Sequence, residues 1–248
     1  MSTLILALAA GAVIGLSLGA LGGGGSVLAV PALIYLLGLT PVAATTAGLL
    51  IVALTSATAL SSHASDGHVR WGTGLLFAAA GIGPAMLGSA LAVHLPERAL
   101  QAAFAMTAAV AAIRMLRPEG EGDATGKTRP GHVAAAGAGL GTVTGVLGVG
   151  GGFLAVPALV GVLGLQMREA VGTSLLVITV NSLAALGMRG GTVGRLDWAV
   201  IAPFAGAAVL GAWDGRRLAS KAKGTSLQHV FALALLAVAA VMLIDAVV

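Results

Sequence analysis

Long apolar stretches, separated by a few short polar segments, make up most of this chain. No Asp, Glu, Lys or Arg occurs before Asp66, and later stretches without these residues cover 71–96, 130–167 and 170–188. Several approach the roughly 20 residues that a helix needs to cross the hydrocarbon core of a bilayer. Their Ala, Leu, Val and Gly content shows no polar alternation, which favours helices over barrel strands. The pattern predicts an all-α protein that crosses a membrane several times.

The chain repeats itself with an offset of 126 residues. Aligning residues 19–39 with residues 145–165 gives 14 identities in 21 positions, and weaker similarity continues on both sides. A polar stretch rich in Pro and Gly, RPEGEGDATGKTRP, separates the two copies. We therefore expect two homologous membrane repeats, residues 1–116 and 132–248, joined by a cytoplasmic linker at residues 117–131.

Each repeat divides into five apolar segments. In the first repeat they cover residues 3–20, 27–38, 42–62, 72–93 and 97–116, and in the second 132–147, 153–164, 170–188, 198–218 and 226–247. The second segment of each repeat holds about a dozen residues, too few to span a membrane at 1.5 Å per residue. We interpret it as a short or re-entrant helix, so that each repeat has about four to five transmembrane segments.

Composition agrees with a bilayer environment. Hydrophobic residues make up 58% of the 248 residues and charged residues only 9%, whereas about a quarter of the residues in a soluble domain carry charge. The net charge of +4 indicates basic cytoplasmic loops rather than nucleic-acid binding. The absence of cysteine excludes disulfides and thiolate ligands. We expect no cofactor and no metal site.

The basic residues predict an orientation. If the first two segments of each repeat make two crossings or a re-entrant pair, ten of the 13 Lys and Arg residues lie on one side of the membrane and three on the other. The positive-inside rule then places both termini outside and the linker inside. The odd number of crossings per repeat makes the repeats inverted relative to each other, as is common in secondary transporters.

Two glycine runs break the helical pattern in its most apolar surroundings, in GALGGGGSVLAVPAL (19–33) and GVLGVGGGFLAVPAL (145–159). Unwound backbone is tolerated in a membrane only where it is buried or lines an aqueous cavity. The short helices that follow begin with free N–H groups and a positive dipole end, and glycine lets a ligand approach the backbone. Such an element favours an anion. The candidate ligands are Gly22, Gly23, Gly24, Gly25, Ser26, Gly148, Gly150, Gly151 and Gly152.

Close helix packing is the alternative for any of these glycines. For Gly11, Gly15 and Gly19, which are spaced by four, we favour packing, because regularly spaced small residues are typical of membrane helix interfaces. An uninterrupted glycine run is different, because it unwinds a helix. Pro31 and Pro157, which follow the two runs, fit either interpretation.

Polar side chains inside apolar segments are further candidates. Thr45, Thr46, Thr173, Ser174 and Asn181 offer hydroxyl or amide donors for an oxyanion without burying a fixed charge. For a single Ser or Thr, a bond to its own helix backbone is the more frequent arrangement. Asn181 is harder to satisfy locally, so ligand binding and interhelical bonding remain equal alternatives there.

Titratable groups give weaker signals. His63, His68 and His94 lie near predicted segment ends, where a histidine is usually solvated, although His63 is a secondary candidate for substrate or proton binding. The carboxylates lie at or near segment ends, so no carboxylate-based proton or sodium site is evident.

These residues resemble a known family. LGGGGSVLAVPALIYLLGL, its partner LGVGGGFLAVPALVGVLGL, AVGTSLLVITVNSLAAL, and the GHVRW and GRLDW ends are similar to the sulfite exporter TauE/SafE family, also called TSUP permeases. The resemblance covers essentially the whole chain. It implies a multi-pass transporter of the prokaryotic cytoplasmic membrane, which exports small sulfur-containing anions such as sulfite or sulfonates. It also implies a site at residues 22–26, 148–152 and 172–174.

Other functions fit less well. A nucleotide site fails because no strands flank the glycines and no Asp or Glu lies about 20 residues on. An intramembrane hydrolase lacks a buried base with a separate orienting partner, so we expect no enzyme. A passive small-anion channel remains the alternative. The expected partners are the anion and the lipid bilayer, without nucleic acid; a homodimer is compatible with the sequence, which leaves the oligomeric state open.

The orientation can be checked with single cysteines at Gly122, Ala222 and Thr192. The first two are predicted to lie inside and should resist an impermeant thiol reagent in intact cells, whereas the cysteine at Thr192 should react. Labelling at Gly122 from outside would contradict the inverted topology.

Overall fold

A computed structural model describes residues 2–21, 24–92, 96–116, 129–147, 152–188, 194, 196–221, 226, 228–233, 236–237 and 239–240. The described residues form helices and turns, without strands. The helices are α1 (Ser2–Leu21), α2 (Gly24–Tyr35), α3 (Pro41–Ser65), α4 (Trp71–Ala92), α5 (Glu97–Leu116), α6 (Pro130–Leu147), α7 (Gly152–Gly161), α8 (Met167–Met188) and α10 (Trp198–Lys221). The all-α prediction is confirmed.

The helix bounds lie within a few residues of those predicted from the apolar segments. The second helix of each repeat is short, with 12 residues in α2 and 10 in α7. Of the segment predicted at 226–247, the structure describes only residues 226, 228–233, 236–237 and 239–240. The predicted linker at 117–131 lies outside the described residues except for its last three, and α6 already begins at Pro130.

Local chemistry sets the helix ends. Thr40 caps α3, because its side chain accepts a hydrogen bond from the N–H of Ala43 at 3.4 Å, and Pro41 occupies the first turn. Asp197 caps α10 in the same way through the N–H of Ala199, at 3.1 Å. These caps satisfy donors that the helices themselves leave unpaired.

Four helices are long and apolar enough to cross a membrane. The spans are Val42–Ser65, Trp71–Gly88, Met167–Gly187 and Trp198–Gly215. Large apolar side chains also point outward from the bundle; Leu87 and Leu210, for example, are each 70% exposed. Such a surface is unfavourable in water and suits lipid. The chain is therefore a multi-pass membrane protein.

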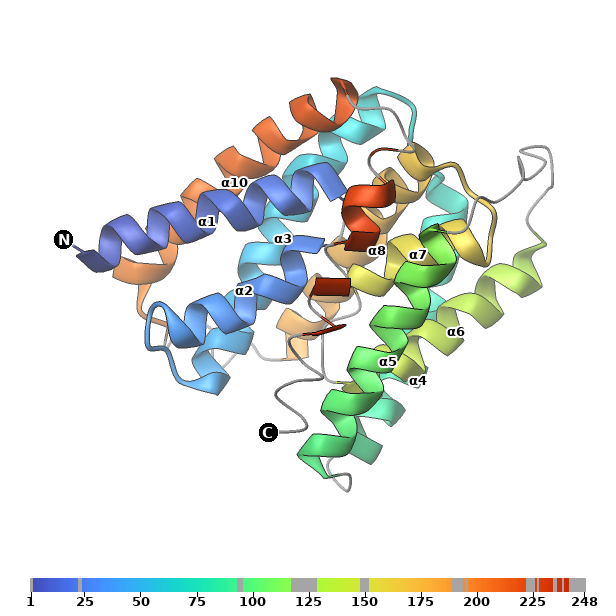
Figure 1. Ribbon diagram of the computed structural model, residues 1–248, viewed down its shortest axis with the longest axis horizontal. Helices are drawn as coiled ribbons and strands as arrows, with labels where there is room; N and C mark the ends of the chain where they lie inside the picture. Colours follow the sequence, from blue (N-terminus) through green and yellow to red (C-terminus); the bar gives the residue numbers. More distant parts are fainter. Residues whose placement is uncertain are drawn as a thin grey trace.

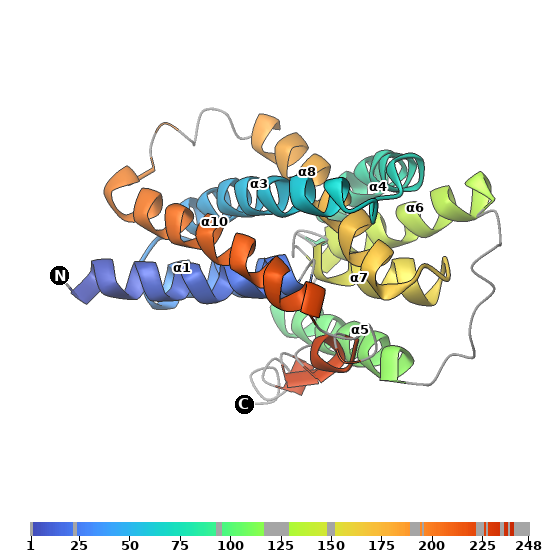
Figure 2. The ribbon, with the colours of Figure 1, turned by 90° about the horizontal axis from the view of Figure 1, so that it is seen from above.

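Helices from different repeats form the most extensive pairs. In both ribbon views α1 lies beside α10 on the left, and α4 lies with α6 on the right (Figures 1 and 2). Between these pairs, α3 packs against α8. The first and fourth helices of one repeat thus pack against the fourth and first of the other.

Spaced glycines bring the paired helices into backbone contact. A Cβ atom added to Gly11, Gly15 or Gly19 of α1 would collide with the backbone carbonyls of Phe204, Ala208 and Ala212 of α10, respectively. On the other side of the molecule, Gly137, Gly141 and Gly145 of α6 meet Phe77, Gly81 and Ala85 of α4 in the same way. The packing interpretation of Gly11, Gly15 and Gly19 is confirmed.

The two central helices, α3 and α8, run in opposite chain directions. The hydroxyl of Thr179 in α8 lies 2.9 Å from that of Ser56 in α3. Nearer the start of α8, Thr173 accepts a hydrogen bond at 3.1 Å from the N–H of Arg70, just beyond the end of α3. Residue numbers therefore rise along one helix as they fall along the other, so α3 and α8 are antiparallel.

The glycine interfaces predict that a single methyl group destabilises the protein. Gly15→Ala and Gly141→Ala should each lower the free energy of unfolding by about 1–3 kcal/mol, because a methyl group forces apart backbones that now touch. Thermal unfolding of the purified protein, followed by size-exclusion chromatography, measures the effect.

Gly139→Ala is the matched control. Gly139 also lies in α6, but nothing lies within 4 Å of its added Cβ. Alanine favours the helix by up to about 1 kcal/mol over glycine, so this variant should be as stable as the wild type or more stable. Equal melting temperatures for Gly141→Ala and Gly139→Ala would refute the backbone contact.

Candidate functional site: the start of the two short helices

The two short helices of the repeats contact each other. Their starts, Gly24 in α2 and Gly152 in α7, are equivalent within two residues under the repeat offset of 126. Gly24, Gly25 and Ser26 form the first turn of α2, and Gly152 is buried at the start of α7. The predicted ligands Gly22, Gly23, Gly148, Gly150 and Gly151 lie outside the described residues. Each short helix begins with N–H groups that have no partner within the helix.

Equivalent turns hold each short helix against the next helix. Gly38 and Gly164 both have φ +66°, a left-handed conformation that glycine adopts at helix ends without strain. The N–H of Gly38 donates to the carbonyl of Ile34 at 3.0 Å, and that of Gly164 to Val160 at 3.1 Å. Because the two turns agree, α7 folds back on α8 as α2 folds back on α3.

The register of α2 on α3 identifies the side chains nearest the helix start. A Cβ atom on Gly48 would lie 3.0 Å from Val30, halfway along the hairpin. Counting outward from this contact at 1.5 Å per residue, Thr55 lies within about one turn of the level of Gly24. The equivalent residue in the second repeat is Asn181. If α7 packs on α8 in the same register, Asn181 lies within about one turn of the start of α7.

Thr45 and Thr46 lie far from that level. Both are in the first turns of α3, and both hydroxyls donate to the carbonyl of Val42, at 3.1 and 2.9 Å. Along α3 they are about 13 Å from the level of Gly24 at 1.5 Å per residue. The structure therefore does not bring these two predicted residues to the start of α2.

The hydroxyl groups bond mostly to their own helices. Thr55 donates to the carbonyl of Ile51 at 2.7 Å, and Ser174 to that of Val171 at 2.8 Å. The backbone-bonding alternative is thus confirmed for Thr45, Thr46, Thr55 and Ser174. A hydroxyl oxygen that donates to its own helix can still accept a hydrogen bond, but its one proton is engaged.

Asn181 is satisfied less fully. Its Oδ1 atom is buried and has no hydrogen-bond partner among the described residues. A buried carbonyl-type oxygen without a partner costs about 1–3 kcal/mol. Of the predicted polar residues, Asn181 is the one whose position and unmet bonding capacity both fit ligand binding.

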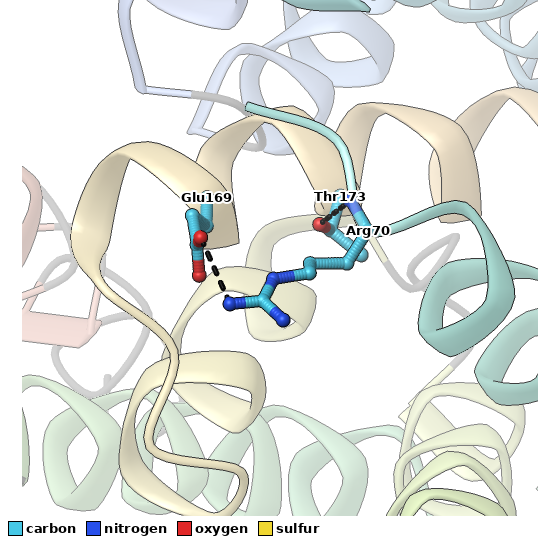
Figure 3. A network of polar contacts seen from close by, with 3 residues as sticks. All are labelled: Arg70, Glu169 and Thr173. Atoms are coloured by element: carbon cyan, nitrogen blue, oxygen red, sulfur yellow. Dashed lines mark hydrogen bonds and ion pairs between the residues drawn. The ribbon is translucent and has the colours of Figure 1, made fainter. Parts of the chain in front are cut away.

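Thr173 bonds to a residue outside its own helix. Figure 3 shows its hydroxyl oxygen against the backbone nitrogen of Arg70, at 3.1 Å, while the Arg70 guanidinium reaches Glu169. Sequence patterns could not reveal this contact, because the partners lie 103 and 99 residues apart in the chain. Gly172 and Thr173 of the GTS motif therefore contact the GHVRW loop.

The expectation that His63 is solvated is wrong. His63 lies in the last turn of α3, but only 8% of it is exposed, because it lies with Ser62 on the buried side of that turn, whereas Ser61 and Ser65 are exposed. His68 is half-buried, and His94 lies outside the described residues. Among the described residues, no group of three or more His, Cys, Asp or Glu could hold a metal ion.

Comparison with known proteins identifies the family. The chain matches the family described as sulfite exporter TauE/SafE over residues 7–242. It belongs to the TauE/SafE family. A relative from Xylella fastidiosa (strain 9a5c), named a probable membrane transporter protein, is 32% identical over 96% of this chain and 94% of its own length.

A second relative, from Xylella fastidiosa (strain Temecula1 / ATCC 700964), carries the same name and is 31% identical over the same shares of both chains. No solved structure matches the chain significantly. Membership in the TauE/SafE family makes this chain a membrane transporter rather than an enzyme.

Proposed function

We propose that this TauE/SafE protein exports small sulfur-containing anions, such as sulfite or sulfonates, through the cytoplasmic membrane of a prokaryote. The anion binds between the starts of α2 and α7, near the midplane of the membrane. The observation that carries the proposal is the contact between two short helices that begin within two residues of equivalent positions in the repeats. The family description, sulfite exporter, supports the substrate class.

Helix length explains why the site would be internal. At 1.5 Å per residue, α2 and α7 reach about 18 and 15 Å, roughly half of a 30 Å hydrocarbon core. A helix of that length in a membrane has one end inside the bilayer. There the N–H groups and positive dipole of its first turn attract an anion more strongly than in water.

An inverted repeat would bring two such ends together from opposite faces of the membrane. The antiparallel crossing of α3 and α8 supports this relation, because these helices are equivalent under the repeat offset. The reciprocal pairing of α1 with α10 and of α6 with α4 supports it as well. Rocking of such repeats around a fixed site is a known route to alternating access.

Asn181 provides the polar side chain of the proposed site. Its amide can donate two hydrogen bonds to an oxyanion, and its oxygen can accept one from a protonated anion. In the first repeat, Thr55 occupies the equivalent position and bonds to its own helix. The two sides of the site are therefore unequal, and Asn181 should contribute more to affinity.

Substitutions at the glycine runs test the site. Gly24→Val and Gly150→Val should abolish sulfite binding to purified protein, because a side chain blocks the approach to the backbone donors. Asn181→Ala should weaken binding about tenfold, as expected for the loss of a hydrogen bond to a charged group. Isothermal titration with sulfite, thiosulfate, sulfoacetate and taurine measures these changes and also ranks the anions.

Gly139→Ala provides the control, since it leaves the site unchanged. Normal binding by both valine variants, with folded protein in each case, would mean that the glycine runs are packing elements and that the proposed site is wrong.

The membrane potential is the proposed driving force, because the sequence shows no buried carboxylate for proton or sodium coupling. At 100 mV, inside negative, a doubly charged anion gains about 4.6 kcal/mol on leaving, or roughly a thousandfold gradient. In liposomes, a valinomycin-driven potassium potential should move the anion toward the positive side at fixed pH and sodium. Transport that follows only a proton gradient would contradict this and point to His63 or an interfacial carboxylate.

A passive anion channel is the alternative, and the same liposomes separate the two. A transporter shows saturation and substrate counterflow, because its site faces one side at a time, whereas an open pore shows neither.

A further inference from the structure

The loop between α3 and α4, residues 66–70, is fixed to the first turns of α8 by three contacts. The Arg70 Nη2 atom lies 3.0 Å from the Glu169 Oε1 atom. The Arg70 N–H donates to the Thr173 hydroxyl at 3.1 Å, as Figure 3 shows. The His68 carbonyl lies so close to Gly172 that an added Cβ would be 2.6 Å from it. An ion pair, a hydrogen bond and a close backbone approach thus hold the loop against the start of α8.

The loop is held to the end of α3 by its own backbone. Gly67 has φ +73°, and the N–H groups of Gly67 and His68 donate to the carbonyls of Ala64 and His63, both at 3.1 Å. Glycine is suited to this left-handed conformation. Because the loop is short and bonded to α3, its contacts with α8 connect the first repeat directly to the second.

The other repeat cannot form the same contacts. Under the repeat offset, Glu169 and Thr173 correspond to Ala43 and Ala47, which have neither a carboxylate nor a hydroxyl. Arg70 corresponds to Asp197, one residue before the equivalent tryptophan. The Asp197 carboxylate accepts a bond from the N–H of Ala199 in its own helix. The charged contact therefore occurs at one end of the α3/α8 pair.

We propose that Arg70, Glu169 and Thr173 form a latch that holds this end of the transporter closed. The inference rests on the alternating access proposed above. Two inverted repeats of identical sequence would favour neither mouth, so a contact present at one mouth alone shifts the population toward the state in which that mouth is closed. The latch is thus formed at one end of the α3/α8 pair only, although the helices of the two repeats are arranged almost symmetrically.

The exposure of the pair suits a contact that opens repeatedly. The side chains of Arg70 and Glu169 are 51% and 24% exposed. Ion pairs with this access to solvent are weak and are screened by salt. Thermal motion can break such a contact during each transport cycle, whereas a buried ion pair would hold the mouth closed.

A single cysteine beneath the latch tests the proposal. The chain has no cysteine, and Val171, on α8 between Glu169 and Thr173, is fully buried. In Val171→Cys protein reconstituted in nanodiscs, reaction with a small maleimide reports opening of this mouth. Adding Glu169→Gln or Arg70→Gln should raise the labelling rate about two- to fivefold, as expected for a partly exposed ion pair. Raising NaCl from 50 mM to 1 M should accelerate labelling of the parent but not of Glu169→Gln.

Two further variants make the result specific. The charge reversal Arg70→Glu with Glu169→Arg should return the labelling rate to within about twofold of the parent, because the pair re-forms. Arg217→Gln removes an exposed ion pair of similar type, at 3.7 Å from Asp214 within α10, and should leave the rate unchanged. If Arg70→Gln does not fold, Arg70→Lys, which keeps the charge, replaces it with a smaller expected increase.

The outcomes separate the latch from the proposed anion site. Labelling rates that are unchanged in the single variants, or that remain raised in the charge reversal, would overturn the latch. The labelling needs no substrate, so it can succeed even if Gly24→Val and Gly150→Val bind sulfite normally. That combination of results would support the latch and refute the proposed anion site.

Discussion

The close approach of helix backbones at two glycine interfaces holds the helix bundle of this protein together. In lipid, apolar side chains gain nothing by leaving their surroundings for each other, so helices associate through van der Waals contact and interhelical polar bonds. Gly15 against Ala208, and Gly141 against Gly81, supply such contact over several turns. Because each interface joins one helix from each repeat, these contacts hold the two repeats together. They also position α3, α8 and the short helices between them.

Glycine serves two opposite purposes in this chain, and its spacing distinguishes them. A glycine every fourth residue leaves the helix intact and gives it a smooth face, as along α1 and α6. Consecutive glycines favour unwinding, and the described short helices begin within such runs. The first pattern builds the scaffold. In the proposed function, the second exposes backbone donors inside it.

The repeats differ at the positions where side chains offer specific chemistry. Asn181 corresponds to Thr55, Glu169 to Ala43 and Arg70 to Asp197. The scaffold contacts are instead preserved, since Phe77 and Phe204 are both fully buried and the turns at Gly38 and Gly164 have the same φ. The two repeats thus share a framework but differ at these polar positions, as the proposed asymmetric site and the proposed latch both require.

The sequence by itself determined the membrane location, the all-α fold, the bounds of nearly every described helix and the packing role of Gly11, Gly15 and Gly19. These features follow from local properties, because hydropathy, segment length and residue spacing can each be read from a short stretch of sequence. Only the tertiary structure decided that α1 packs against α10, that Thr173 and Glu169 hold the loop at Arg70, and that His63 is buried. A glycine-lined helix face does not identify the helix that packs against it. An ion pair between residues 99 positions apart produces no pattern in the local sequence. Such contacts form only when helices that are distant in the sequence pack against each other.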